Sequence, residues 1–161
     1  MRIAVLIGAL ALAGCSDEPS EAEREAAVAE VEAHQEPPVE ELEPAQFTAA
    51  DIERGDLYGA GCIFKRPSDG EYGIAIARAG EGYLKRNGDV HILAADMGSA
   101  ELPYLARRKY DGRVYSFTID LDAEAGVQSG EETSDYPAML SVRDGQDRIV
   151  FETRGTAQCG A

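Results

Sequence analysis

Four tight-turn signals divide the C-terminal part of the chain into short apolar segments, and they constrain the fold more than any other feature. The signals are Ser68-Asp69-Gly70, Asn87-Gly88, Asp111-Gly112 and Asp144-Gly145. Asn-Gly and Asp-Gly pairs supply the positive φ that a tight hairpin requires. The segments around them are rich in Val, Ile, Tyr, Phe and Leu, which favour strands. The pattern predicts antiparallel strands joined mostly by hairpins.

Alternation of apolar and polar residues is clearest at 113–121. Tyr115, Phe117 and Ile119 share one face of this segment, and Ser116 and Thr118 share the other, so one face should be buried. Strands are expected at 61–66, 72–79, 82–86, 89–94, 104–110, 113–121, 137–143 and 148–154. Eight short strands in this arrangement predict an all-β fold, an antiparallel up-and-down meander closed as a small barrel. A β-sandwich is the alternative.

The segment before this domain has a different composition. Residues 16–46 hold eleven acidic residues and one basic residue, with almost no large apolar side chains. Such a stretch buries too little apolar surface to offset chain entropy. It predicts a disordered acidic tether, or a partly helical one with a helix over 20–34 capped by Ser20 and Glu23. The same capping signature at Thr48 and Asp51 predicts a short helical turn.

The folded domain is expected to span residues 47–161. The whole chain has a formal net charge of −15, but the domain holds 19 acidic and 13 basic residues and has a net charge of −6. Most of the negative charge therefore belongs to the tether and says little about a partner. Because the domain has no basic stripe interleaved with aromatic residues, no nucleic-acid binding is expected.

The N-terminus has the organisation of a secretory signal: a positive charge at Arg2, an apolar stretch over 3–13, and small residues at its end. The stretch is too short to span a bilayer. Leu12-Ala13-Gly14-Cys15 resembles the lipobox of bacterial lipoproteins. The resemblance implies a signal peptide over 1–14, cleavage before Cys15, and diacylation of the Cys15 thiol with palmitate or a similar chain.

The same resemblance implies where the protein is found. Residues 15–46 would be the lipidated N-terminus and tether, and the membrane would be contacted through the lipid anchor. By resemblance to envelope sorting, Ser16 after the lipidated cysteine favours the outer membrane, facing the periplasm. In an exported protein the two other cysteines, Cys62 and Cys159, are expected to form a disulfide, with two independent buried thiols as the alternative.

Basic residues flank the four turns. In a meander these turns lie at one end of the sheet, so we predict a basic pole there, with the tether and the disulfide at the other end. The pole would bind an anionic ligand or an envelope protein; protection of strand ends from aggregation is the alternative. The residues are Lys65, Arg66, Lys85, Arg86, Arg107, Arg108 and Lys109.

No constellation of residues indicates a reaction, and a non-catalytic protein is expected. His91 is the only histidine of the domain, and no nucleophile elbow is present. Zinc would need three or four ligands, and no cysteine stays free. The acidic loop 120–131 departs from the EF-hand pattern because Gly126 falls at position seven. Neither a metal nor a cofactor is expected.

The order of lipobox, tether and a domain bounded by cysteines resembles the membrane-bound inhibitors of C-type lysozyme, which form small antiparallel barrels. That family carries Ser-Gly-x-x-Tyr and Lys-Gly segments. The nearest stretch here runs from Gly98-Ser99 to Tyr104 in reversed order, and Lys-Gly does not occur. The resemblance therefore implies the architecture without the inhibitory residues.

A membrane-anchored envelope lipoprotein with a soluble β-barrel binding or protective module is the expected function. A lysozyme-type hydrolase inhibitor is one alternative. A carrier of a small apolar ligand is another, and its barrel interior would be lined by Ile74, Ile76, Tyr115 and Phe117.

Overall fold

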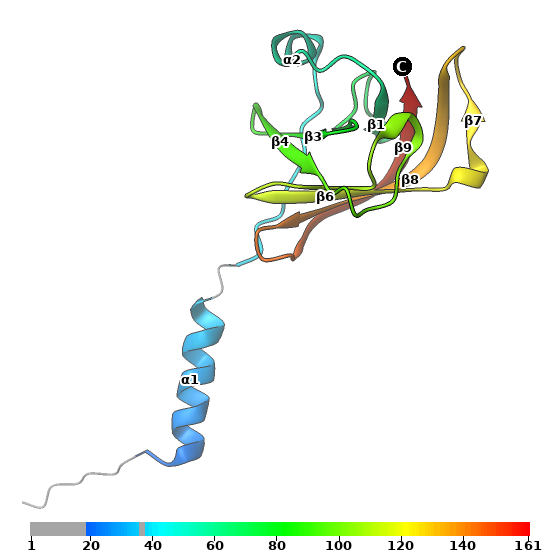
Figure 1. The fold of residues 1–161 in the computed structure, drawn as a ribbon. Coiled ribbons are helices and arrows are strands. Elements are labelled where there is room, and N and C mark those ends of the chain that lie inside the picture. The colour runs from blue at the N-terminus through cyan, green and yellow to red at the C-terminus, as the bar shows by residue number, and fades with distance from the viewer. Residues whose placement is uncertain (1–18, 36–37) are drawn as a thin grey trace, which may run out of the picture. The chain divides into compact units, whose positions relative to one another are not determined.

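The structure is a computed structural model that describes residues 19–35 and 38–161 (Figure 1). The chain forms two compact units, Met1–Pro38 and Val39–Ala161. The predicted signal peptide and Cys15 lie outside the described residues. Among the described residues, no helix has the length and apolar character needed to cross a membrane.

In the described part of the first unit, residues 19–35 and 38, the chain forms helix α1 (Glu21–Gln35). Its start is fixed by Ser20, whose backbone N–H donates to the Glu23 carboxylate at 2.7 Å while the Glu23 N–H donates to the Ser20 hydroxyl at 3.3 Å. This reciprocal pair satisfies two backbone donors that the first turn leaves free. The helical alternative for this part of the tether is confirmed.

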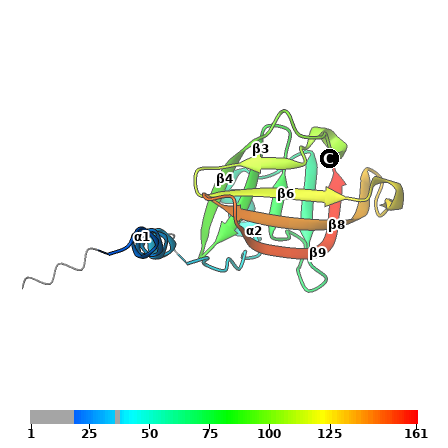
Figure 2. The ribbon, with the colours of Figure 1, turned by 90° about the horizontal axis from the view of Figure 1, so that it is seen from below.

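The second unit is a closed antiparallel barrel, which confirms the predicted fold (Figures 1 and 2). The strand order is β6-β5-β4-β3-β2-β1-β9-β8, and pairing of β6 with β8 closes the ring. A two-residue strand, β7 (Val127–Gln128), pairs with β8 as an extra edge. The barrel strands are β1 (Gly61–Lys65), β2 (Ala75–Ala77), β3 (Glu81–Arg86), β4 (Asp89–Ala95), β5 (Lys109–Asp111), β6 (Tyr115–Leu121), β8 (Thr133–Asp144) and β9 (Ile149–Gly160).

The four predicted turns lie at one end of the barrel, as an up-and-down meander requires. We call this end the turn end. Asn87 and Gly88 have φ values of 51° and 89°, the left-handed pair that a two-residue hairpin needs. Cys62 and Cys159 lie at the opposite end, the disulfide end. They are directly opposite each other in the β1–β9 ladder and form the predicted disulfide, with their Cα atoms 4.0 Å apart.

The strand predicted at 104–110 is mostly wrong. Only Lys109–Asp111 is strand, and Pro103–Leu105 forms a 3₁₀ turn, η1. Proline at the start of η1 lacks a backbone donor, and the next two residues are left-handed, so this segment cannot continue a ladder. The chain instead makes an excursion between β4 and β5 and carries residues 96–108 to the disulfide end.

A second apolar cluster lies outside the barrel. The predicted helical turn is α2 (Ala49–Gly55), with a capping box between Thr48 and Asp51. Ile52, together with Phe47 and Leu57, packs on Ile76 of β2. Ile76 therefore faces outward beneath α2, and its predicted place in the barrel interior is wrong.

Residues 39–46 form a strap across the turn end (Figure 1). Leu42 and Pro44 are buried, and Leu42 belongs to the main core. The Leu42 N–H donates to the Val150 carbonyl at 3.0 Å, and the Ala45 N–H donates to the Lys85 carbonyl at 2.8 Å. The folded unit therefore begins at Val39, eight residues before the predicted boundary. The expectation that the tether leaves from the disulfide end is wrong.

Candidate functional site

The barrel interior is filled where a small-ligand carrier would need space. Ile74 has no surface that water can reach, and Phe117 has only 1%. Tyr110 stacks on Phe117 with ring centroids 4.8 Å apart, and a Cβ on Gly82 would lie 2.5 Å from the Tyr110 ring. A ligand-sized void beside these residues would leave them accessible surface. Binding is therefore to be sought on the outer surface.

Four of the seven predicted basic residues lie on or beside β1 and β3 at or near the turn end, and polar partners hold all four. Arg66 pairs with Glu43 and Asp69. Arg86 pairs with Glu40 and also bonds the Tyr115 hydroxyl. Lys85 pairs with Asp51, and Lys65 Nζ donates to the Gln158 side-chain oxygen at 2.8 Å. The carboxylates Glu40 and Glu43 come from the strap, so this chain's own acidic segment occupies the basic surface.

Of the other three basic residues, Lys109 lies beside Asp111 of the Asp111-Gly112 turn, whereas Arg107 and Arg108 lie away from the turn end, so the prediction is wrong for these two. Arg107 pairs with Glu101 within the β4–β5 excursion, with the charged groups 3.1 Å apart. Arg108 pairs with Asp120 near the end of β6, and Lys109 pairs with Asp111. The excursion moves Arg107 and Arg108 along the barrel, because residues 104–108 do not form a strand. A single basic pole does not exist.

Asp51 gives a pH-dependent prediction. Hydrogen bonds from Lys85 and from Thr48 lower its pKa from an ordinary 3.8 to about 2. The folded state therefore holds this carboxylate ionised more strongly than the unfolded state does. Its stabilising contribution should be full above about pH 4 and be lost as the pH falls through about 2. Asp51→Asn should flatten this part of the stability curve, measured as the urea midpoint against pH.

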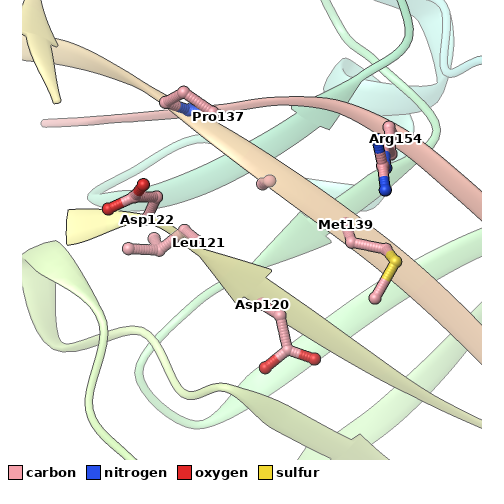
Figure 3. Close-up of a pocket in the computed structure, with 7 residues that line it drawn as sticks. Asp120, Leu121, Asp122, Pro137, Met139 and Arg154 are labelled. Carbon is pink, nitrogen blue, oxygen red and sulfur yellow. The ribbon is translucent and has the colours of Figure 1, made fainter. Parts of the chain in front are cut away.

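The outer face of β6, β8 and β9 carries a shallow hollow of about 400 Å³ (Figure 3). Met139 lies directly opposite Asp120 on β6 and Arg154 on β9. β6 ends at Leu121, whose partner on β8 is Ala138. Within residues 38–161, no strand therefore pairs with the next residue, Pro137, on the β6 side of β8. A proline there removes no ladder donor. The hollow thus forms where the chain leaves the barrel wall.

The acidic side chains that line this hollow have polar partners. Asp120 is paired with Arg108, and Asp122 accepts the Glu124 N–H at 3.1 Å. Arg154 makes no ion pair among the residues that the structure describes. A negatively charged group could bind Arg154 beside the apolar surface of Leu121, Pro137 and Met139. The hollow is, however, shallow and open to solvent. Sequence patterns did not indicate it, because the three strands meet only in the closed barrel.

At the disulfide end, η1 presents two strained residues, which we call the η1 tip. Tyr104 and Leu105 have φ values of 58° and 62°, a conformation that costs non-glycine residues about 1–3 kcal/mol each. The Leu105 side chain is 61% exposed and Tyr104 is 37% exposed. The fold therefore holds an unfavourable backbone where it displays an aliphatic and an aromatic side chain.

Contacts on both sides hold the η1 tip in place. Leu102 and Ala106 are buried, and the Leu102 N–H donates to the Ala106 carbonyl at 2.8 Å. The Tyr104 hydroxyl donates to the Glu132 carbonyl of the β7–β8 turn. The Pro103 carbonyl oxygen lies 3.8 Å from Cys62 Sγ. Of this site the sequence analysis named only Tyr104, through a resemblance, because left-handed backbone at Leu105 has no sequence signal.

Comparisons with protein families, with curated proteins and with solved structures found no match to this chain. Within residues 19–35 and 38–161, no three His, Cys, Asp or Glu side chains lie together as a metal site would require.

Proposed function

We propose that this chain is a lipid-anchored, non-catalytic binding module of the bacterial cell envelope, and that the η1 tip is its contact surface. The strained, exposed pair Tyr104 and Leu105 is the observation that supports this. Backbone strain persists only where the surrounding structure fixes it, and it clusters at sites of ligand contact. The Tyr104 hydroxyl has a hydrogen-bond partner, whereas the Leu105 side chain is exposed and belongs to neither apolar cluster of the folded unit.

Charge near the η1 tip narrows the class of partner. Residues 120–135, which carry the β7–β8 turn that bonds Tyr104, hold six acidic residues and no basic residue. A partner with an apolar pocket and a basic rim would complement the exposed Leu105 side chain and the acidic surface of residues 120–135. We therefore propose a protein partner over an acidic glycan or a lipid phosphate.

Membrane anchoring rests on the lipobox residues. Cys15→Ser should abolish incorporation of radiolabelled palmitate and release the protein from the membrane fraction, because no other thiol is placed for acylation. A conservative change outside the lipobox, Ser20→Thr, serves as the control. Palmitate incorporation that survives Cys15→Ser would refute the anchor.

A lysozyme-type hydrolase inhibitor is a second candidate. It is favoured by the small closed antiparallel barrel with Cys62 and Cys159 joined, which is the architecture that the family resemblance implies. The test is lysozyme turnover with and without an excess of the protein. Inhibition that Leu105→Asp removes would assign this function, and no inhibition by the wild-type chain would leave the binding module with another partner.

Leu105→Gly separates strain from function. Glycine accepts the left-handed backbone, so this variant should be about 1 kcal/mol more stable than the wild type by urea unfolding. It should bind the partner more weakly, because the exposed side chain is gone. Leu105→Ala keeps the strain and serves as the matched variant. A Leu105→Gly protein that is less stable than the Leu105→Ala protein would contradict the account.

A further inference from the structure

Strand β4 has an edge that no neighbour covers. Toward β3, its residues Asp89–Ala94 are all paired. Toward β5, only Ala94 and Ala95 are paired, because β5 is three residues long. β4 and β5 thus pair only near the disulfide end, and we call the boundary between them the seam. Among residues 38–161, no strand borders the first half of β4 on its β5 side.

The alternation of an antiparallel ladder identifies the uncovered groups. The Asp96 N–H donates to the Lys109 carbonyl at 3.0 Å, so the even-numbered residues direct their backbone groups toward β5. Val90 and Ile92 therefore direct their N–H and C=O groups into the seam. Gly112, in the turn after β5, lies beside Leu93, because a Cβ added to Gly112 would be 3.1 Å from Leu93 Cγ. The turn therefore covers β4 as far as Leu93 and leaves Val90 and Ile92 uncovered.

The surroundings of this edge are apolar and accessible. Ile92 is 64% exposed, and Val90 beside it is half-buried. From inside the barrel the seam is closed by Tyr115, whose ring packs edge-on against His91 with centroids 5.3 Å apart. Open edges are usually protected by lysine, proline or a bulge. The run Val90-His91-Ile92 has none of these.

We propose that the open edge of β4 is a strand-addition site for an extended segment of a partner protein, distinct from the η1 tip. Backbone hydrogen bonds to Val90 and Ile92 would give the segment its register. Apolar side chains at alternate positions of the segment would pack on Ile92 and Val90. Asp89 is exposed and makes no ion pair within 38–161, so a basic residue fits beside it.

Net charge indicates whether the open edge of β4 binds a segment of another protein or a second copy of this chain. The domain itself, residues 47–161, carries −6, so the folded units of two copies repel each other, whereas a basic segment is attracted. The occupant is therefore a segment that alternates β-branched apolar residues with polar ones and carries a basic residue at one end.

The test uses a ¹⁵N-labelled full chain with Cys15→Ser and a synthetic probe peptide, Arg-Val-Thr-Val-Thr-Val. Added probe should shift the amide signals of Val90 and Ile92 and slow their hydrogen exchange. A probe N-methylated at the amides that face β4 cannot donate and should bind at least about tenfold more weakly. Equal binding of the two probes would overturn the proposal. Shifts at these amides that depend on protein concentration without a probe would also overturn it, in favour of a second copy.

Variants of β4 sharpen the test. Ile92→Pro removes a donor that points away from β3 and should abolish probe binding. Ile92→Lys keeps the donor, places a positive charge against the basic probe, and should weaken binding if the proline variant does not fold. Ala94→Lys changes the same face where the backbone is already bonded to β5, and should bind as the wild type does. Leu105→Asp should also leave probe binding unchanged, which separates this site from the η1 tip.

Discussion

Replacing Cys62 and Cys159 by serine should lower the free energy of unfolding by about 4–5 kcal/mol. The two residues are 97 positions apart in the chain, so the disulfide closes a long loop and removes much of the entropy of the unfolded state. It also joins β1 to β9, the first and the last strand of the barrel. Urea unfolding of the full chain measures the change.

Reductant provides the control for this prediction. Reducing the Cys15→Ser protein should bring its stability close to that of the double serine variant, and the double variant should not respond. A loss of less than 1 kcal/mol on reduction would contradict a structural role of the disulfide.

Leu42→Ala should destabilise the barrel by about 2–5 kcal/mol, the cost of truncating a buried leucine. Leu42 is 3% exposed and packs in the main core from the strap, where the composition of the chain predicts a solvated tether. Glu41→Ala is the matched control, because Glu41 is the exposed neighbour. Equal urea midpoints for the two variants would mean that the strap does not belong to the folded unit.

Local signals in the sequence predicted most of the fold. Asn87-Gly88 marks a two-residue hairpin because only a left-handed pair closes it, and the structure has that pair. The capping residues Ser20 and Thr48 start helices for a similarly local reason, since each satisfies backbone donors of its own first turn. Hairpins in a row then leave few ways to arrange eight strands.

Features that depend on distant contacts were not predicted. Leu42 stands between Glu41 and Glu43, and Pro44 follows Glu43. The acidic average composition of 16–46 does not indicate that these two residues are buried against the turn end of a barrel. Arg107 and Arg108 belong to a segment whose conformation is set by burial of Leu102 and Ala106 in that same core. Their positions follow from tertiary packing and not from the spacing of turns.

The candidate site was predicted least well for the same reason. Left-handed backbone at Leu105 is imposed by the anchoring of the residues around it, since isolated leucine avoids that region. The open edge of β4 depends on the length of β5, which is short because the chain is drawn away to form η1. Both surfaces are consequences of one excursion between two strands.

A photo-crosslinking residue placed at position 105 tests the binding proposal most directly. In the envelope fraction of bacterial cells that express it, the full-length protein with the crosslinker at Leu105 should yield a specific protein adduct on illumination. The control is the same crosslinker at Ile149, which is 47% exposed at the turn end and should yield none. An adduct from position 149 and none from position 105 would contradict the assignment of the η1 tip as the contact surface.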